Sequence, residues 1–278
     1  MAQTALNKAR LALETAQKAL TAAQPPVVTT KSPDPAPTTT PTTSNNDSNN
    51  IVDLMVLYTT ANQTADFAKQ RIQYLVTASN QSYKDSGMKV ALRLVYAEPT
   101  TYTDNNSNSQ ALNDLAANRG AFVDVNQKRT QYGADLVFLF RPLFAQTSGS
   151  CGTTYLEGAN GTPLNASIGF GTINDGNGKD SPNYYCNVNT FTHEIGHSFG
   201  LVHDRENSNI QGAYPYSYAW GVQGRFATIM SYKSPVVMLF STPNLPTQCA
   251  GTPCGFAESN PTQSSDQVKS ANLSLPKI

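Results

Sequence analysis

The chain has 278 residues, of which 14% are charged, and its formal net charge at pH 7 is zero. This balance gives no support to nucleic-acid binding or to a membrane held by basic residues, and no apolar run approaches the roughly 20 residues that a spanning helix needs. The chain begins without the basic stretch and compact apolar core of a secretory signal, so export requires a removed signal or another route.

The first fifty residues differ in composition from the rest. Ala and Leu alternate at spacings of four and three over residues 2–23, and this heptad seam predicts a short helix over residues 1–24. A helix this short is only marginally stable in isolation. Three interpretations of this segment are open: a solvated, weakly helical tail, a helix that associates with a partner helix, and the remnant of a longer upstream segment. Residues 25–50, rich in Pro, Thr, Ser and Asn, predict a disordered linker.

Residues 51–278 carry the pattern of one α/β domain, long enough for a substantial core. Apolar runs predict strands at residues 51–59 and 134–140, and alternating apolar residues predict a strand at residues 89–96. Apolar spacings of three and four predict a helix at residues 61–84, and another helix is expected at residues 108–131. Segments 151–157 and 166–173 resemble edge strands, and helices are expected at residues 188–199 and 264–273. This alternation is typical of a mostly parallel sheet.

A glycine-rich turn offers a candidate calcium site. Asp175, Asn177 and Asp180 supply oxygen ligands, but the twelve-residue pattern and its terminal glutamate are missing, so a plain polar loop is the alternative.

The four cysteines, Cys151, Cys186, Cys249 and Cys254, allow three connectivities. The cysteines are not expected to form a zinc site, because no C-x-x-C pair exists and the three histidines of the chain lie together in the motif described next. Two disulfides imply an oxidising compartment, outside the cell or in a periplasm; free buried thiols in the cytosol are the alternative.

All three histidines of the chain lie within eleven residues, in the run H-E-I-G-H-S-F-G-L-V-H. His193 and His197 are four apart, so on a helix their rings project from one face and can share a tetrahedral Zn²⁺. Gly200 can end the helix in the left-handed conformation, and His203 then reaches the metal from the returning chain. Three neutral ligands leave a fourth position open, which indicates a catalytic zinc.

Glu194 follows the first histidine and points about a quarter-turn away from it on the helix. It can therefore reach a water at the metal without being a ligand, and can take its proton during attack on a carbonyl. Two histidines four apart are also compatible with a polar helix face. The presence of Glu194, Gly200 and His203 at the spacings that a zinc site needs favours the metal site instead.

This run resembles the signature of the metzincin metallopeptidases, H-E-x-x-H-x-x-G-x-x-H followed by a Met-turn. Met230, in T-I-M-S-Y, matches the methionine that forms an apolar floor beneath the imidazoles. The resemblance implies that Asp204 anchors the Met-turn, as in reprolysin-like members. Tyr232 matches the astacin and serralysin tyrosine, which lies near zinc and stabilises the oxyanion; a packing role is the alternative.

Residues 51–278 also resemble the bacterial peptidyl-Asp metalloendopeptidases, through the opening strand, S-C-G-T-T-Y-L, Y-P-Y-S-Y-A-W-G and R-F-A-T-I-M. The resemblance favours disulfides 151–186 and 249–254. It implies that an extended peptide binds along an edge formed by Gly152, Thr153, Thr154 and Tyr155. It further implies cleavage before aspartate, for which Lys233 is the first candidate cation and Arg225 the second; a solvated surface lysine is the alternative.

The implied fold is metzincin-like: a twisted, mostly parallel five-stranded sheet with an antiparallel edge strand, a zinc helix and a small irregular C-terminal subdomain. The upper subdomain would cover residues 51–200 and the lower one residues 201–278. The expected function is that of a secreted or periplasmic, bacterial zinc endopeptidase acting on extended protein or peptide substrates. The alternatives are an effector or toxin protease with a narrow substrate range and a non-catalytic binding module on the same scaffold.

Overall fold

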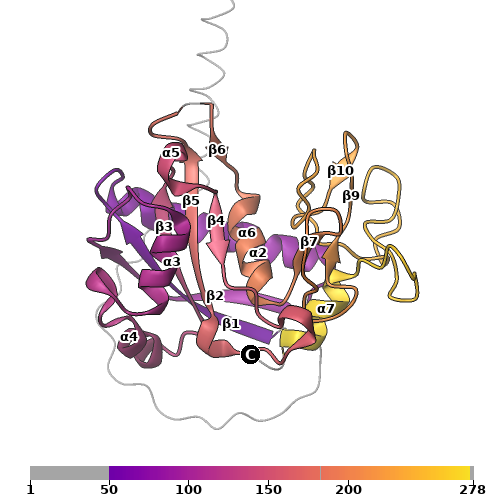
Figure 1. The fold of residues 1–278 in the computed structure, drawn as a ribbon, viewed down its shortest axis with the longest axis horizontal. Helices are drawn as coiled ribbons and strands as arrows, with labels where there is room; N and C mark the ends of the chain where they lie inside the picture. Colours follow the sequence, from indigo (N-terminus) through magenta and orange to yellow (C-terminus); the bar gives the residue numbers. More distant parts are fainter. Residues whose placement is uncertain (1–49, 182, 276–278) are drawn as a thin grey trace, which may run out of the picture. The chain divides into compact units, whose positions relative to one another are not determined.

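The computed structural model describes residues 50–181 and 183–275 (Figure 1). Its main sheet has the order β2-β1-β3-β5-β4, and a short strand, β6, pairs antiparallel with the end of β5. These strands are β1 (Asn50–Thr59), β2 (Val90–Thr100), β3 (Leu136–Pro142), β4 (Gly152–Thr154), β5 (Phe170–Asn177) and β6 (Tyr185–Cys186). β2, β1, β3 and β5 are mutually parallel, whereas β4 pairs antiparallel with β5. The predicted mostly parallel sheet with an antiparallel edge strand is confirmed.

Helices cover both faces of this sheet. The α-helices of the described residues are α2 (Ala65–Ser86), α3 (Asn108–Ala116), α4 (Val125–Tyr132), α5 (Ala145–Ser148), α6 (Asn189–Ser198) and α7 (Gln267–Ser274). Alternate residues of β1 point to opposite faces. Leu54 and Val56 join a core with α2, α6 and α7, and Met55 and Leu57 join a second core with α3. Because both faces are buried, the central strands appear in the sequence as continuous apolar runs.

Two predicted helices differ from the structure. α2 begins at Ala65 rather than at residue 61, because Thr64 is its N-cap and accepts a hydrogen bond from the Phe67 N–H. The single helix expected over residues 108–131 is two helices separated by a 3₁₀ turn at Gly120–Phe122. Asn118 and Gly120 have φ of 52° and 57°, and such left-handed residues cannot continue a helix.

The chain after α6 has little regular structure apart from α7. Its strands are short: β7 (Val202–Asp204), β8 (Tyr218–Ala219), β9 (Gly221–Val222) and β10 (Phe226–Ala227). β7 pairs parallel with β8, and β9 pairs antiparallel with β10. The division into subdomains at residue 200 stays a prediction. The helix predicted over residues 1–24 and all but Asn50 of the predicted linker lie outside the described residues. In the described ranges, no helix has the length and apolarity needed to cross a membrane.

Candidate active site

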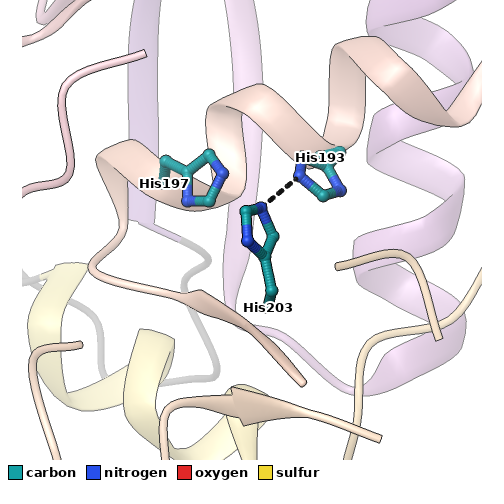
Figure 2. Close-up of side chains that lie close together, drawn as sticks. All are labelled: His193, His197 and His203. Atoms are coloured by element: carbon teal, nitrogen blue, oxygen red, sulfur yellow. Dashed lines mark hydrogen bonds between the residues drawn. The ribbon is translucent and has the colours of Figure 1, made fainter. Parts of the chain in front are cut away.

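The sequence around α6 brings the three histidines together (Figure 2). His193 and His197 lie one turn apart on this helix. The helix ends in a Schellman motif, in which the Gly200 N–H donates to the His197 carbonyl and the Leu201 N–H donates to the Gly196 carbonyl. Gly200 has a φ of 76°, the left-handed conformation predicted for it. The reversed chain enters β7, which carries His203.

The ring nitrogens of these histidines converge. One nitrogen from each of His193, His197 and His203 lies within 4.8 Å of the others, and this is the only such group of three or more potential ligands in residues 50–181 and 183–275. The Nε2 atoms of His193 and His203 are 3.1 Å apart. Since a carbonyl only accepts, Nδ1 of His193 must donate to the Ile229 carbonyl, 3.0 Å away, and Nδ1 of His197 to the Leu201 carbonyl, 2.9 Å away. Both Nε2 atoms therefore present lone pairs.

Burial keeps these imidazoles neutral. It lowers the pKa of His193 to about 4, assisted by the neighbouring His203, and it lowers the pKa of His197 well below its usual value. Desolvation also lowers the pKa of His203. Neutral imidazoles with converging lone pairs are the ligand set that Zn²⁺ prefers, so the residues fit the metal that the sequence predicts.

The side chain of Glu194, which belongs to α6, is buried against the edge strand β4. Its Oε2 accepts a hydrogen bond from the Thr154 hydroxyl at 2.8 Å. Burial raises the pKa of this carboxyl to about 8, whereas the bond from Thr154 lowers it. A bound divalent cation would favour the ionised form. The link between Thr154 and Glu194 was not predicted, because sequence spacing does not reveal which edge-strand side chain faces the helix.

The predicted Met-turn packs against α6 at Gly196. Met230 is fully buried, and a Cβ built at Gly196 would lie 2.6 Å from its Sδ. The glycine in the middle of the histidine motif therefore allows Met230 to approach the helix. The role of Gly196 was not predicted, although a glycine inside a helix is a signal for close packing.

Asp204 connects the histidine segment to the Met-turn. Its Oδ2 accepts hydrogen bonds from the Ser231 hydroxyl at 2.8 Å and from the Tyr232 N–H at 3.0 Å, and Asn207 donates to its Oδ1. Burial acts to raise the pKa of Asp204, but these hydrogen bonds outweigh it and lower the pKa. This geometry agrees with the anchoring role expected for Asp204.

The Tyr232 ring lies beside the histidines. Its centroid is 4.1 Å from that of His203 and 6.0 Å from that of His193, and the residue is 63% exposed. Partial burial raises the pKa of its phenol. Tyr232 therefore lies at the solvent-exposed edge of the histidine cluster.

A cavity of about 210 Å³ adjoins the first histidine. The residues that line it are Ser150, Cys151, Gly152, Asn189, Thr190, His193, Glu194, Ile229, Ser231 and Tyr232. None of them is Lys or Arg. Lys233 lines a different cavity, of about 190 Å³, and pairs there with Glu206 at 3.1 Å. The Arg225 guanidinium donates to the Ala250 carbonyl. The structure therefore does not bring either candidate cation into the cavity beside Glu194.

The edge strand β4 presents part of its backbone to the outside of the sheet. The Tyr155 N–H donates to the Phe170 carbonyl, and the Asn174 N–H donates to the Cys151 carbonyl. Because the pairing alternates along an antiparallel ladder, the backbone groups of Gly152 and Thr154 point away from β5. The Tyr155 hydroxyl donates to Asn113, and Thr153 Oγ1 donates to the Gly152 carbonyl.

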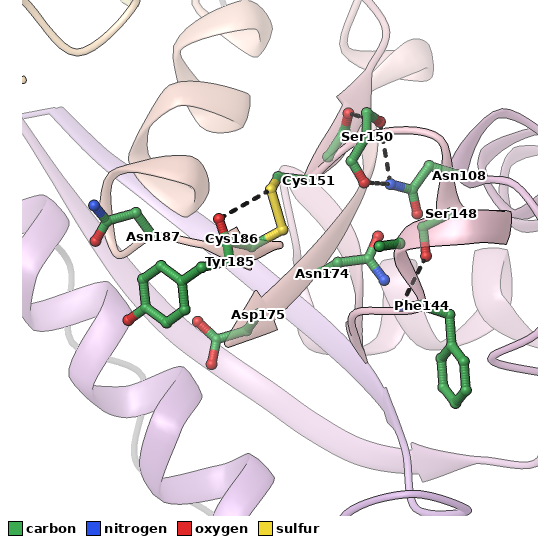
Figure 3. The surroundings of a disulfide bond; sticks show 12 residues. Asn108, Phe144, Ser148, Ser150, Cys151, Asn174, Asp175, Tyr185, Cys186 and Asn187 are labelled. Carbon is green, nitrogen blue, oxygen red and sulfur yellow. Dashed lines mark hydrogen bonds between the residues drawn. A yellow bond between two sulfur atoms is a disulfide. The ribbon is translucent and has the colours of Figure 1, made fainter. Parts of the chain in front are cut away.

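The structure contains both disulfides that the resemblance favours, Cys151–Cys186 and Cys249–Cys254. The first joins the residue before β4 to the end of β6, and thereby ties the edge strand to the segment that leads into α6 (Figure 3). The second closes a small loop after the Met-turn.

The predicted calcium site has no support. The Asp175 carboxylate forms a bidentate salt bridge with Arg71, in which both nitrogen–oxygen distances are 2.8 Å. The Asp180 carboxylate accepts hydrogen bonds from the N–H groups of Ala145 and Gln146 at the start of α5. Asn177 belongs to β5 and pairs with Tyr185. The two carboxylates therefore have separate structural partners and do not share one ion.

Comparison with known proteins identifies relatives. A sequence model of the reprolysin-like M12B metallopeptidases matches residues 39–260. A peptidyl-Asp metalloendopeptidase of Pseudomonas aeruginosa is 34% identical over 261 residues, which are 82% of this chain and 39% of the relative. One of Stenotrophomonas maltophilia is 28% identical over 201 residues, 69% of this chain and 44% of the relative. The chain thus spans less than half the length of these relatives.

The fold also occurs among solved structures. One described as the structure of a chaperone–substrate complex aligns with a TM-score of 0.62 over 81% of this chain and 34% of the other, at 18% identity. At this identity the likeness concerns the fold alone. The family match, together with the three converging histidines, shows that the chain belongs to the reprolysin-like M12B family of metallopeptidases.

Proposed function

We propose that this protein is a zinc-dependent endopeptidase, in which His193, His197 and His203 hold the metal and Glu194 is the general base. The observation that carries the proposal is the convergence of three neutral imidazoles within 4.8 Å, next to a buried carboxylate on the same helix. The names of the bacterial relatives give independent support.

Zn²⁺, when bound, supplies a Lewis acid that lowers the pKa of a water to roughly 7 and polarises the peptide carbonyl. Glu194 takes a proton from the attacking water as the new carbon–oxygen bond forms. It then delivers a proton to the amide nitrogen, which leaves as an amine when the carbon–nitrogen bond breaks. Tyr232, whose ring centroid lies 4.1 Å from that of His203, would donate a hydrogen bond to the negatively charged oxygen that develops during attack.

The substrate is proposed to be an extended peptide that adds to β4. The Gly152 N–H and the backbone groups of Thr154 point to the free edge and can pair with a peptide backbone, with Thr153 between them and Tyr155 next along the chain. The cavity of about 210 Å³ beside His193 and Glu194 would receive one side chain of that peptide.

Cleavage before aspartate is the proposed specificity, because the relatives carry the name peptidyl-Asp metalloendopeptidase. Asn189 and Thr190 line the cavity, and an amide and a hydroxyl can donate hydrogen bonds to a carboxylate. Lys233 is the alternative, provided that it leaves Glu206 when substrate binds.

An oxidising location, outside a bacterial cell or in a periplasm, is proposed from the two disulfides and the bacterial relatives.

The test is a cleavage-site profile of the purified protein on a denatured protein mixture, with and without a zinc chelator. We expect chelator-sensitive cuts that cluster before acidic residues. Glu194→Gln should keep zinc and lose cleavage by at least about 100-fold, whereas Glu258→Gln, at an exposed carboxylate paired with Lys269, should cleave normally. Full activity of Glu194→Gln would refute the assigned base. Zinc-loaded protein without any cleavage would favour the binding-module alternative.

A further inference from the structure

The Glu194 carboxylate is confined by two residues of the edge strand. Gly152 and Thr154 are two apart on β4, so they face the same side of the sheet. The Thr154 hydroxyl donates to Oε2 of Glu194 at 2.8 Å. A Cβ built at Gly152 would lie 2.5 Å from Cγ and 2.7 Å from Oε1 of the same side chain, so only glycine allows this approach. One carboxylate oxygen is therefore bonded to Thr154 and the other lies against the Gly152 backbone.

The neighbouring strand is shaped to accommodate the threonine. Gly171 of β5 lies directly opposite Thr154 in the sheet register. A Cβ at residue 171 would lie 2.7 Å from Thr154 Oγ1 and 2.3 Å from the Phe138 ring. The hydroxyl thus occupies space that exists only because residue 171 is glycine.

We propose that Thr154 is a positioning residue for the general base: its hydroxyl holds the Glu194 carboxylate in the orientation that proton transfer requires. This inference rests on the proposed endopeptidase function. It gives β4 two separable roles. The backbone of Thr154 faces the free edge, where substrate would pair, whereas its side chain faces Glu194. Removing the hydroxyl alone should therefore reduce kcat and leave KM unchanged.

The experiment compares Thr154→Val, which keeps the shape and removes the hydroxyl, with Thr154→Ser, which keeps the hydroxyl. Partners of this kind at a catalytic centre typically contribute about 10-fold to 100-fold. We expect kcat of Thr154→Val to fall by that factor with KM within about twofold, while Thr154→Ser stays near wild type. Thr130→Val, at an exposed position of α4, is the matched control. Zinc content should be equal in all four proteins.

The proposal is overturned if Thr154→Val raises KM and leaves kcat unchanged, because Thr154 would then act on substrate. It is also overturned if Thr154→Ser loses as much kcat as Thr154→Val, since the hydroxyl would not be the cause. A crystal structure of the zinc-loaded wild-type protein gives a second measurement that needs neither a variant nor an assay. A Thr154 Oγ1 to Glu194 oxygen distance beyond 3.5 Å would exclude the hydrogen bond. Absence of cleavage by the wild type would instead count against the proposed function, and the crystallographic test would still stand.

Discussion

Glu157 is a buried carboxyl that the proposed reaction does not use. Its side chain has 0% exposure, its Oε2 accepts a hydrogen bond from the Asn165 N–H at 3.2 Å, and its Oε1 has no hydrogen-bond partner among the described residues. Burial raises the pKa of Glu157 from 4.5 to about 7, against the lowering effects of the Asn165 hydrogen bond and the Arg129 charge. The substitution to test is Glu157→Gln, which keeps the shape and removes the titration.

The pKa shift determines the sign and size of the effect. Because the folded protein holds this proton more tightly than the unfolded chain, the contribution to stability is fully present below pH 4.5 and is lost as pH rises through about 7. At 1.36 kcal/mol per pKa unit, the shift corresponds to a loss of about 3 kcal/mol between pH 4.5 and pH 8. Glu157→Gln lacks this loss, so its stability relative to wild type should increase by about 3 kcal/mol over that range.

The assay is urea denaturation of both proteins at several pH values from 4.5 to 8, with the difference in free energy of unfolding plotted against pH. Groups that the two proteins share cancel in this difference. Glu258→Gln is the control for removing a carboxylate from an exposed site. A difference for Glu157→Gln that stays constant within about 0.5 kcal/mol across the range would refute the reasoning, because Glu157 would then titrate alike in the folded and unfolded protein.

Two further predictions concern the loop around the metal site. Asp204→Ala removes the acceptor of the Ser231 hydroxyl and the Tyr232 N–H, and should lower the free energy of unfolding by about 1–3 kcal/mol in urea denaturation; an unchanged value would show that Asp204 does not anchor the Met-turn. Lys233→Ala breaks the pair with Glu206 in the neighbouring cavity, and should leave the ratio of cleavage before Asp to cleavage before Asn within about twofold of wild type. A collapse of that ratio would assign aspartate recognition to Lys233.

Much of the metal site could be predicted from the sequence because its geometry is local. The spacing of His193 and His197 fixes their common helix face, and a glycine at residue 200 permits the turn that returns His203. The central strands were likewise predictable, since burial on both faces leaves continuous apolar runs such as that of β3.

Features set by tertiary contacts were harder to predict. The break between α3 and α4 depends on Asn118 in a left-handed conformation, which its neighbours in sequence do not require. Asp175 resembled a calcium ligand because its actual partner, Arg71, lies 104 residues away on α2. Lys233 follows the Met-turn directly, yet its pair with Glu206 in another cavity depends on how the two segments meet.

The same contrast between local and distant contacts distinguishes His197 from His193. His197 is oriented by the Leu201 carbonyl, four residues along the chain, so its ring is fixed by the turn that ends its own helix. His193 is oriented by the Ile229 carbonyl, 36 residues away in the segment that leads into the Met-turn. Local opening of that segment would therefore remove the hydrogen bond that fixes the tautomer of His193, while the hydrogen bond of His197 would remain. The tautomer of His193 consequently depends on the folding of a segment much later in the chain, whereas that of His197 depends only on the end of its own helix.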